Sequence, residues 1–261
     1  MSATTISTNA RVGTPIPFSR LVKVELRKTT DTRAGRWLLI AIGAITFIAI
    51  ALFVAFAKAE DLKFRTLVLV AGTPQGFLLP VLGILAITSE WSQRTGLTTF
   101  TLEPSRQRVL TSKIVAVLLL GFGAILFMLT LAALANVIGG TLTDEAGSWA
   151  GNAAVIRNVF VLQILGLLGG LAFGTILLNS APAIVLSFIA PTLMGVVVNI
   201  VPGLSGAAPW IDAGTAQGPL FDFDGSEVTW EAWGQILVTS FWWVWIPLAA
   251  GTYRVLRTEL K

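Results

Sequence analysis

Long apolar runs separated by short polar segments dominate the chain. No ionisable residue occurs from 67 to 88 or from 114 to 143, and none occurs between Arg157 and Asp212. A helix needs about 20 consecutive apolar residues to cross a bilayer, so these runs are long enough to be transmembrane helices. The pattern therefore predicts an all-α, polytopic membrane protein.

The apolar runs fit six spans. The stretch that follows Arg157 is too long for one span, and the polar turn Asn179 to Pro182 divides it into two. Pro74 and Pro80 are expected to kink the second span, which spans in membranes tolerate. One transmembrane domain is expected over 36–257, with spans at about 37–57, 66–88, 114–137, 159–178, 183–201 and 232–253.

The residues before the first span divide into two parts. Residues 1–16 are rich in Ser and Thr and are expected to form a disordered lead. Over 17–34, apolar positions recur near helical spacing between basic ones, which predicts an amphipathic helix in the membrane interface. An ordinary basic tail beside the first span is the alternative. The charged positions of the expected helix are Arg20, Lys23, Glu25, Arg27 and Lys28.

The distribution of Lys and Arg predicts the orientation. If the N-terminus is cytoplasmic, six spans put residues 89–113 and the C-terminus on the same side. That side then carries 14 of the 18 basic residues, and the other side carries four beside nine acids. Cytoplasmic segments of membrane proteins are enriched in Lys and Arg, so both termini are expected in the cytoplasm.

Composition narrows the function. Only 12% of the 261 residues are charged against 54% hydrophobic, with no Cys and no His, so thiolate chemistry and Cys/His zinc sites are excluded. The spans carry essentially no acidic or basic residue, which argues against a proton-coupled transporter or a cation channel. No phosphate-binding GxxxxGK[ST] motif occurs. We expect no catalytic residue, no metal site, no cofactor and no nucleic-acid partner for this chain.

Polar and aromatic residues within the spans are the candidates for a substrate path. Hydrogen bonding between neighbouring helices is the alternative for the amides, and dimer packing is the alternative for the tryptophans. The candidates are Asn136, Gln163, Asn199, Trp242 and Trp245.

The longest polar break in the first half of the chain is 89–113. Thr95 to Phe100 could form a short helix that ends before Pro104, and a plain connecting loop is the alternative. A basic segment of this kind, held between two spans, can present a surface to a soluble partner.

The order of residues in this break resembles that of bacterial ABC-type exporter permeases of the type-2 class. Glu90-Trp91 is followed by a Thr-rich segment, Pro104, basic residues and Lys113, and residues 21–28 (LVKVELRK) resemble the interfacial helix of that family. The resemblance implies a homodimer, or a dimer with a related permease. It also implies two copies of a separate ATP-binding cassette subunit, which would bind ATP and magnesium.

The resemblance also implies which residues contact that subunit. They are Glu90, Arg94, Thr95, Leu97, Thr98, Thr99, Phe100, Pro104 and Arg106. Pairing with lipid phosphates is the alternative for the arginines. Short re-entrant helices are implied for 202–231, where an exposed extracellular loop is the alternative.

The expected function is that of a permease subunit of an ATP-driven exporter in the bacterial plasma membrane. Its substrate would be hydrophobic or amphipathic, such as a drug, lipid or peptide, and the chain itself would not be an enzyme. A non-transporting membrane interaction or assembly factor is the first alternative, and a passive facilitator is the second.

Overall fold

The computed structural model describes residues 16–92, 101, 103–142, 148–149, 152–222 and 227–257. Within these ranges the chain folds almost entirely as helices, and no strand occurs there. The expected disordered lead lies outside the described residues except for Ile16, and so does the expected loop helix over 95–100.

Six helices are long and apolar enough to cross a membrane, which confirms the predicted number of spans. The last of them consists of α10 (Trp230–Ser240), a π-helical segment (Phe241–Trp245) and α11 (Ile246–Arg257). The other five are α2 (Arg33–Phe56), α3 (Phe64–Ser92), α5 (Arg106–Leu142), α6 (Asn152–Leu177) and α7 (Ser180–Ile200).

The spanning helices are longer than their apolar cores. α3 continues to Ser92, past the expected end at 88, and α5 begins at Arg106, before the expected start at 114. The polar connection between them is therefore shorter than the predicted 89–113. α3 also remains one helix through Pro74 and Pro80, which membrane-spanning helices tolerate.

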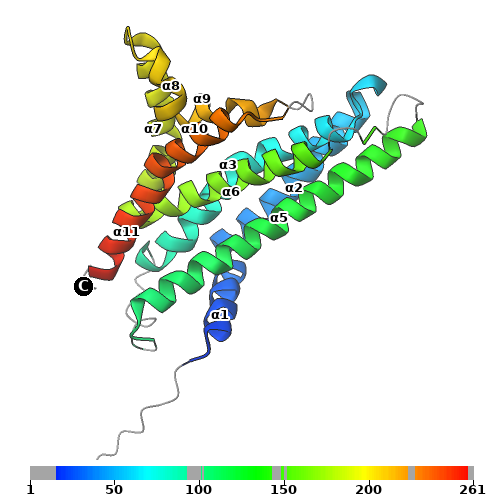
Figure 1. Cartoon of the computed structure of the whole chain (residues 1–261). Coiled ribbons are helices and arrows are strands. Elements are labelled where there is room, and N and C mark those ends of the chain that lie inside the picture. Colours follow the sequence, from blue (N-terminus) through cyan, green and yellow to red (C-terminus); the bar gives the residue numbers. More distant parts are fainter. Residues whose placement is uncertain are drawn as a thin grey trace, which may run out of the picture.

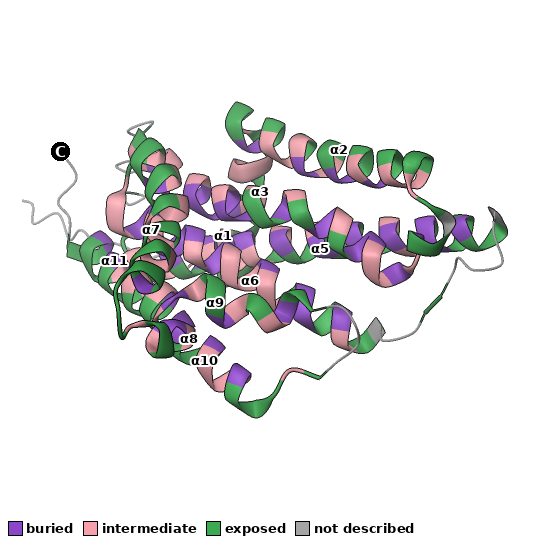
Figure 2. Ribbon diagram, turned by 90° about the horizontal axis from the view of Figure 1, so that it is seen from above, coloured by how far each residue is buried: buried purple, intermediate pink, exposed green. Residues whose placement is uncertain are grey.

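Helices α3 and α6 form the centre of the bundle. About half of the apolar window of each is buried, 56% for α3 and 50% for α6, and the buried residues of Figure 2 concentrate there. Glycines allow the two backbones to touch: a Cβ on Gly170 would lie 2.0 Å from the carbonyl oxygen of Pro80, and one on Gly83 would lie 2.6 Å from that of Leu167. Small residues at such crossings are typical of membrane helix packing.

Helices α2 and α7 lie at the periphery. Only 17% of the apolar window of α2 and 11% of that of α7 are buried. In Figure 1, α7 diverges from the direction shared by α3, α5 and α6. Both helices therefore expose continuous apolar surface.

Segments far apart in the sequence meet at one end of the bundle. The Arg108 guanidinium donates to the carbonyl of Ile16, and that of Arg106 donates to the carbonyls of Val255 and Leu256 at 3.4 Å. The N-terminal segment, the start of α5 and the C-terminal helix thus share this end, which we call the polar end. The opposite end is closed by Phe64, whose ring stacks on Trp149 at 5.1 Å.

The first helix, α1 (Phe18–Asp31), crosses the polar end at an angle to the spans (Figure 1). The turn into α2 is tight: Thr32 caps α2 by accepting from the Gly35 N–H at 3.2 Å. A Cβ on Gly35 would lie 1.9 Å from the carbonyl oxygen of Thr29, so glycine is required at this turn.

Two short helices, α8 (Ala208–Ile211) and α9 (Ala213–Gln217), return along the last span. The Trp243 indole N–H donates to the carbonyl of Ile211 at 2.8 Å. Trp243 lies 13 residues into the last span, about 20 Å from its start at 1.5 Å per residue. The segment therefore reaches the middle of that span, and we call α8 and α9 together the re-entrant segment. The remaining short helices are η1 (Ala59–Asp61), η2 (Ser205–Ala207) and η3 (Gly218–Phe221).

Candidate functional site

Four charged side chains form a closed ring at the polar end. Lys28 Nζ lies 2.7 Å from both Glu25 Oε1 and Glu90 Oε1. Lys113 Nζ lies 2.5 Å from Glu25 Oε2 and 3.4 Å from Glu90 Oε1. The signs alternate around the ring, so every charge has two partners of opposite sign. We call these four residues the charge ring.

The position of each residue in its helix explains how it reaches the charge ring. Glu25 is on the inward face of α1 beside Val22, and Lys28 follows it by three residues, the spacing that makes neighbours on a helix. Glu90 comes from the last turns of α3, beyond the apolar core of that helix. Lys113 is the last ionisable residue before the apolar run of α5. The ring therefore joins three helices.

Burial makes the charge ring a strong constraint on the relative positions of these helices. The side chains of Glu25, Glu90 and Lys113 are at most 9% exposed, whereas that of Lys28 is 36% exposed. Removing buried charges from water is costly, and only close partners offset that cost. Moving α1 away from α3 and α5 would separate the partners, so the three helix ends are expected to move together.

The protonation state of Lys28 is set by opposing effects. Partial burial alone would lower the pKa of its amine, because burial disfavours the charged form. The hydrogen bonds and charges of Glu25 and Glu90 together outweigh burial and raise the pKa of Lys28 above its ordinary value. Lys28 is therefore charged at neutral pH.

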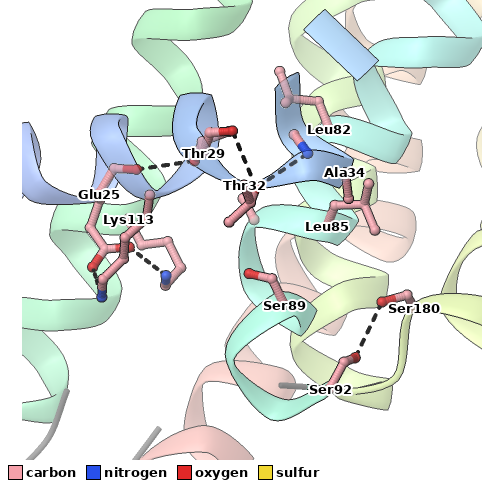
Figure 3. Close-up of a pocket in the computed structure, with 13 residues that line it drawn as sticks. Glu25, Thr29, Thr32, Ala34, Leu82, Leu85, Ser89, Ser92, Lys113 and Ser180 are labelled. Atoms are coloured by element: carbon pink, nitrogen blue, oxygen red, sulfur yellow. Dashed lines mark hydrogen bonds and ion pairs between the residues drawn. The ribbon is translucent and has the colours of Figure 1, made fainter. Parts of the chain in front are cut away.

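A cavity of about 150 Å³ lies beside the charge ring (Figure 3). Glu25 and Lys113 border it on one side, and the hydroxyl groups of Ser92 and Ser180 border it on the other. Ser180 Oγ lies 2.7 Å from the buried hydroxyl of Thr88 and 3.5 Å from that of Ser92. These contacts bring the start of α7 to the end of α3, so four spans meet the polar end near the ring.

Three residues of the predicted subunit contact lie within the described part of the chain. Glu90 belongs to the charge ring, Pro104 is exposed, and Arg106 binds the carbonyls at the end of α11. The others lie outside the described residues: Arg94, Thr95, Leu97, Thr98, Thr99 and Phe100. Arg108, two residues after Arg106 on α5, pairs with Glu103 at 3.1 Å.

The charged residues predicted for the interfacial helix separate into two faces of α1. Arg20, Lys23 and Arg27 are exposed, whereas Glu25 is buried and Lys28 is half-buried in the charge ring. A basic outer face suits contact with anionic lipid headgroups or with a soluble partner. The inner face, with Glu25 and Lys28, contacts α3 and α5.

The structure does not bring the five candidate path residues together. Gln163 is buried between α3 and α6, and Asn136 is fully buried in α5 with neither amide atom hydrogen-bonded. Asn199 is exposed on α7, and its amide donates to the carbonyl of Gly195 in its own helix. Trp242 and Trp245 lie on the outer surface of the last span, 55% and 49% exposed.

Sequence reasoning missed two groups of residues. The sequence motif includes Lys113, the only lysine between Lys63 and Lys261, but does not indicate that it is buried in the charge ring. Trp243, and not its two neighbours, holds the re-entrant segment. No sequence signal separates these adjacent tryptophans, because the π-helical turn changes which side each one occupies.

The comparisons with known proteins add no relative. No protein-family model matches the chain, and no match was found among curated proteins. In the part of the chain that the structure describes, no cluster of Asp and Glu could hold a metal ion.

Proposed function

We propose that this chain is the membrane-spanning permease subunit of an ATP-driven exporter, with ATP hydrolysed by a separate cassette subunit. The charge ring is the observation that carries the proposal. The apolar spans hold no titratable group that could drive transport, so another subunit has to supply the force. The charge ring connects α1, at the polar surface, rigidly to α3 and α5.

The route of the force follows from the contacts. A soluble subunit that presses on the exposed basic face of α1 would displace Glu25 and Lys28, and through them Glu90 and Lys113. α3 packs against α6 through Pro80 and Gly170, so displacement of α3 reaches the centre of the bundle. Close packing favours motion of such helices as rigid bodies.

The distribution of charge supports a cytoplasmic position for the polar end. The three segments with most of the basic residues, around α1, at the start of α5 and in α11, converge there. Lys and Arg are enriched on the cytoplasmic side of membrane proteins. We therefore place both termini in the cytoplasm and the protein in a bacterial plasma membrane.

In the membrane, a second copy of the chain or a related permease is the proposed partner. The exposed apolar faces of α2 and α7 leave room for it, and lipid covers whatever the partner does not. The substrate is proposed to be hydrophobic or amphipathic, because the spans offer apolar and neutral polar groups.

Purification of the tagged full-length chain from its own membranes in mild detergent tests the proposal. A subunit with a phosphate-loop motif should be retained, and it should hydrolyse ATP. Glu90→Gln, which leaves Lys28 and Lys113 with one carboxylate, should reduce ATP-driven transport in vesicles. Glu60→Gln at the opposite end, in an exposed pair, is the matched control and should not.

The other outcomes identify the alternatives. Retention of an ATPase without transport would indicate an interaction or assembly factor. Flux that does not depend on ATP would indicate a facilitator. Absence of any nucleotide-binding subunit from the purified complex would contradict the proposal.

A further inference from the structure

One face of α3 lines the cavity beside the charge ring, from the apolar part of the helix to its polar end. Four residues of this face recur at helical spacing and line the cavity: Leu82, Leu85, Ser89 and Ser92. Figure 3 shows the two leucines on one side of Ser89 and Ser92 on the other. The cavity of about 150 Å³ has room for roughly ten water molecules, at about 10–15 Å³ each. It therefore suits a ligand with a compact polar head and an apolar body.

The cavity lies at the level of the lipid headgroups. Gly35, at the start of α2, lines it, and Trp37, two residues later, is 68% exposed. Tryptophan side chains are enriched at the boundary between the headgroups and the apolar core of a membrane. Arg33 and Arg36 are exposed beside them, and basic residues at this level attract lipid phosphates. The position favours a membrane lipid over a dissolved molecule.

Lipid has lateral access to the cavity. α2 contributes Ala34 and α7 contributes Ser180, and both helices pack against α3. The apolar windows of α2 and α7 are only 17% and 11% buried, so both helices expose apolar surface to the membrane. Ala34 and Ser92 on the cavity wall are themselves exposed. A lipid of the same leaflet can therefore place its headgroup in the cavity without leaving the membrane.

The charged part of the wall favours a phosphate group. Lys28, Lys113 and Glu25 line the cavity, so two ammonium groups and one carboxylate face it. Lys28 is the most exposed of the three, with a side chain that is 36% exposed. An ammonium group at this exposure is within reach of a ligand and attracts phosphate oxygens.

The hydroxyl part of the wall favours a hydrogen-bond donor. The Thr88 hydroxyl donates to the carbonyl of Ile84 at 2.9 Å, so its one proton is used. Ser180 Oγ lies 2.7 Å from Thr88 Oγ1 and must therefore be the donor in that pair. Because its own proton is used, the half-buried Ser180 can only accept a hydrogen bond from a ligand.

We infer that this cavity binds the headgroup of a phospholipid with a terminal ammonium group, of the phosphatidylethanolamine type. The phosphate lies against Lys28, the ammonium group donates to Ser180, and the acyl chains follow Leu82 and Leu85. The charge ring is neutral as a whole, so a zwitterionic headgroup adds no net charge beside the buried Glu25. A headgroup with only a negative charge would add one, and an uncompensated charge at such a place is costly.

A bound headgroup connects a span that the charge ring does not reach. Ser180 belongs to α7, which has no member in the ring, whereas Lys28 belongs to α1. The lipid therefore acts as a regulatory ligand that attaches a peripheral span to the polar end. The inference goes beyond the proposed exporter function and does not rest on it, because lipid binding is measured on the chain alone.

Native mass spectrometry of the full-length chain, purified in detergent and stripped of lipid, tests the inference. The chain is titrated with phosphatidylethanolamine, phosphatidylcholine and phosphatidylglycerol that carry the same acyl chains. Choline keeps the phosphate and the positive charge but has no N–H to donate. Phosphatidylethanolamine should bind at least about fivefold more tightly than phosphatidylcholine, as expected for one hydrogen bond from a charged donor.

Two substitutions separate the contacts. Ser180→Ala removes the acceptor and should lower the affinity for phosphatidylethanolamine to that for phosphatidylcholine, which should not change. Lys28→Met should weaken the binding of both lipids, because both carry the phosphate. Ser187→Ala is the matched control, since Ser187 is also a half-buried serine of α7 and donates within its own helix. It does not line the cavity and should leave both affinities unchanged.

Filling the cavity provides an independent check. Ser89→Leu places a larger side chain on the cavity wall and should abolish the preference for phosphatidylethanolamine. If this variant does not fold, Ala34→Leu at the exposed edge of the wall should still reduce binding of that lipid.

Equal affinities for phosphatidylethanolamine and phosphatidylcholine in the wild-type protein would overturn the inference, and so would a preference that survives Ser180→Ala. Tighter binding of phosphatidylglycerol would overturn the zwitterionic assignment and indicate an anion site. Soluble glycerophosphoethanolamine, at the same concentration as the lipid, should not displace it. Displacement would overturn the assignment to lipid and indicate a site for the free headgroup.

Discussion

Lys113 Nζ lies 2.5 Å from Glu25 Oε2, across 88 residues of sequence, with both side chains at most 7% exposed. This pair attaches α1 to the start of α5, and Glu90 extends the connection to α3 at 3.4 Å from the same nitrogen. A helix that lies across the ends of the spans is thereby joined to two of them by buried charge.

Substituting one residue of this pair should destabilise the protein more than substituting both residues. Glu25→Gln leaves the buried Lys113 with Glu90, at 3.4 Å, as its one carboxylate, and loss of one partner from a buried pair typically costs about 3–5 kcal/mol. Lys113→Met should behave similarly. The double variant should be more stable than the sum of the single effects predicts, because it leaves fewer unpaired charges.

The measurement is the free energy of unfolding of the four proteins in mixed detergent micelles. The exposed pair Lys58–Glu60, with a separation of 3.7 Å, is the control, and Lys58→Met should cost less than about 1 kcal/mol. Additive effects of Glu25→Gln and Lys113→Met would show that the two residues do not interact.

Lys28 makes a pH-dependent contribution to the docking of α1. Its pKa is raised in the folded protein, so the contribution is complete below the pKa of the unfolded chain and is lost as pH rises through the folded pKa. The melting temperature of the wild-type protein should therefore exceed that of Lys28→Met by a constant amount from neutral pH up to about pH 10.

Above about pH 10 the difference between the two proteins should shrink. Comparing wild type with the variant at each pH cancels the titration of groups that do not contact Lys28. A difference that already shrinks between neutral pH and about pH 9 would contradict the raised pKa of Lys28.

The crossing of α3 and α6 should tolerate no side chain at Gly170. A Cβ there would lie 2.0 Å from the Pro80 carbonyl oxygen, a backbone atom that cannot rotate away. Gly170→Ala should destabilise the fold by at least about 1–3 kcal/mol, as overpacking does. The thermal unfolding midpoint in detergent measures the effect.

The neighbouring residue provides the control. A Cβ on Gly169 would meet no atom within 4 Å, so Gly169→Ala should be neutral or slightly stabilising, by up to about 1 kcal/mol. Equal effects of the two substitutions would mean that the helices do not cross at Gly170.

The indole of Trp243 should hold the re-entrant segment against the last span. Trp243→Phe removes the N–H that donates to Ile211 and keeps most of the aromatic volume. Because the chain has no cysteine, one introduced at the fully buried Ala216 reports on α9 alone. It should react slowly with a water-soluble thiol reagent in the wild-type background and several-fold faster with Trp243→Phe.

Trp242→Phe is the corresponding control, because the Trp242 side chain is 55% exposed on the outer surface. It should leave the reaction rate unchanged. Fast reaction at residue 216 in the wild-type background would show that the segment does not pack where the structure has it.

The spans could be predicted from sequence because their signal is local. Each is a run of apolar residues long enough to cross a bilayer, and all six were predicted with ends within about five residues, except at the starts of α5 and α6. Those two starts were missed because each helix continues through charged residues beyond its apolar core, Arg106 and Arg108 in α5 and Arg157 in α6. Hydropathy marks where a span leaves the lipid and not where the helix ends.

The charge ring could not be predicted from sequence because its members come from three segments. Glu25, Glu90 and Lys113 each read locally as a polar residue beside an apolar run. Only the crossing of α1 over the ends of α3 and α5 shows that they share one buried site.

The central claim is that the polar end, where the charge ring lies, faces the cytoplasm and receives force from a soluble ATPase. Labelling of single cysteines in intact cells with a membrane-impermeant maleimide tests it most directly. The sites are Lys58→Cys at the opposite end and Gln107→Cys at the polar end, both exposed. Our account predicts labelling of residue 58 in intact cells and of residue 107 only after permeabilisation. Labelling of residue 107 in intact cells would contradict it.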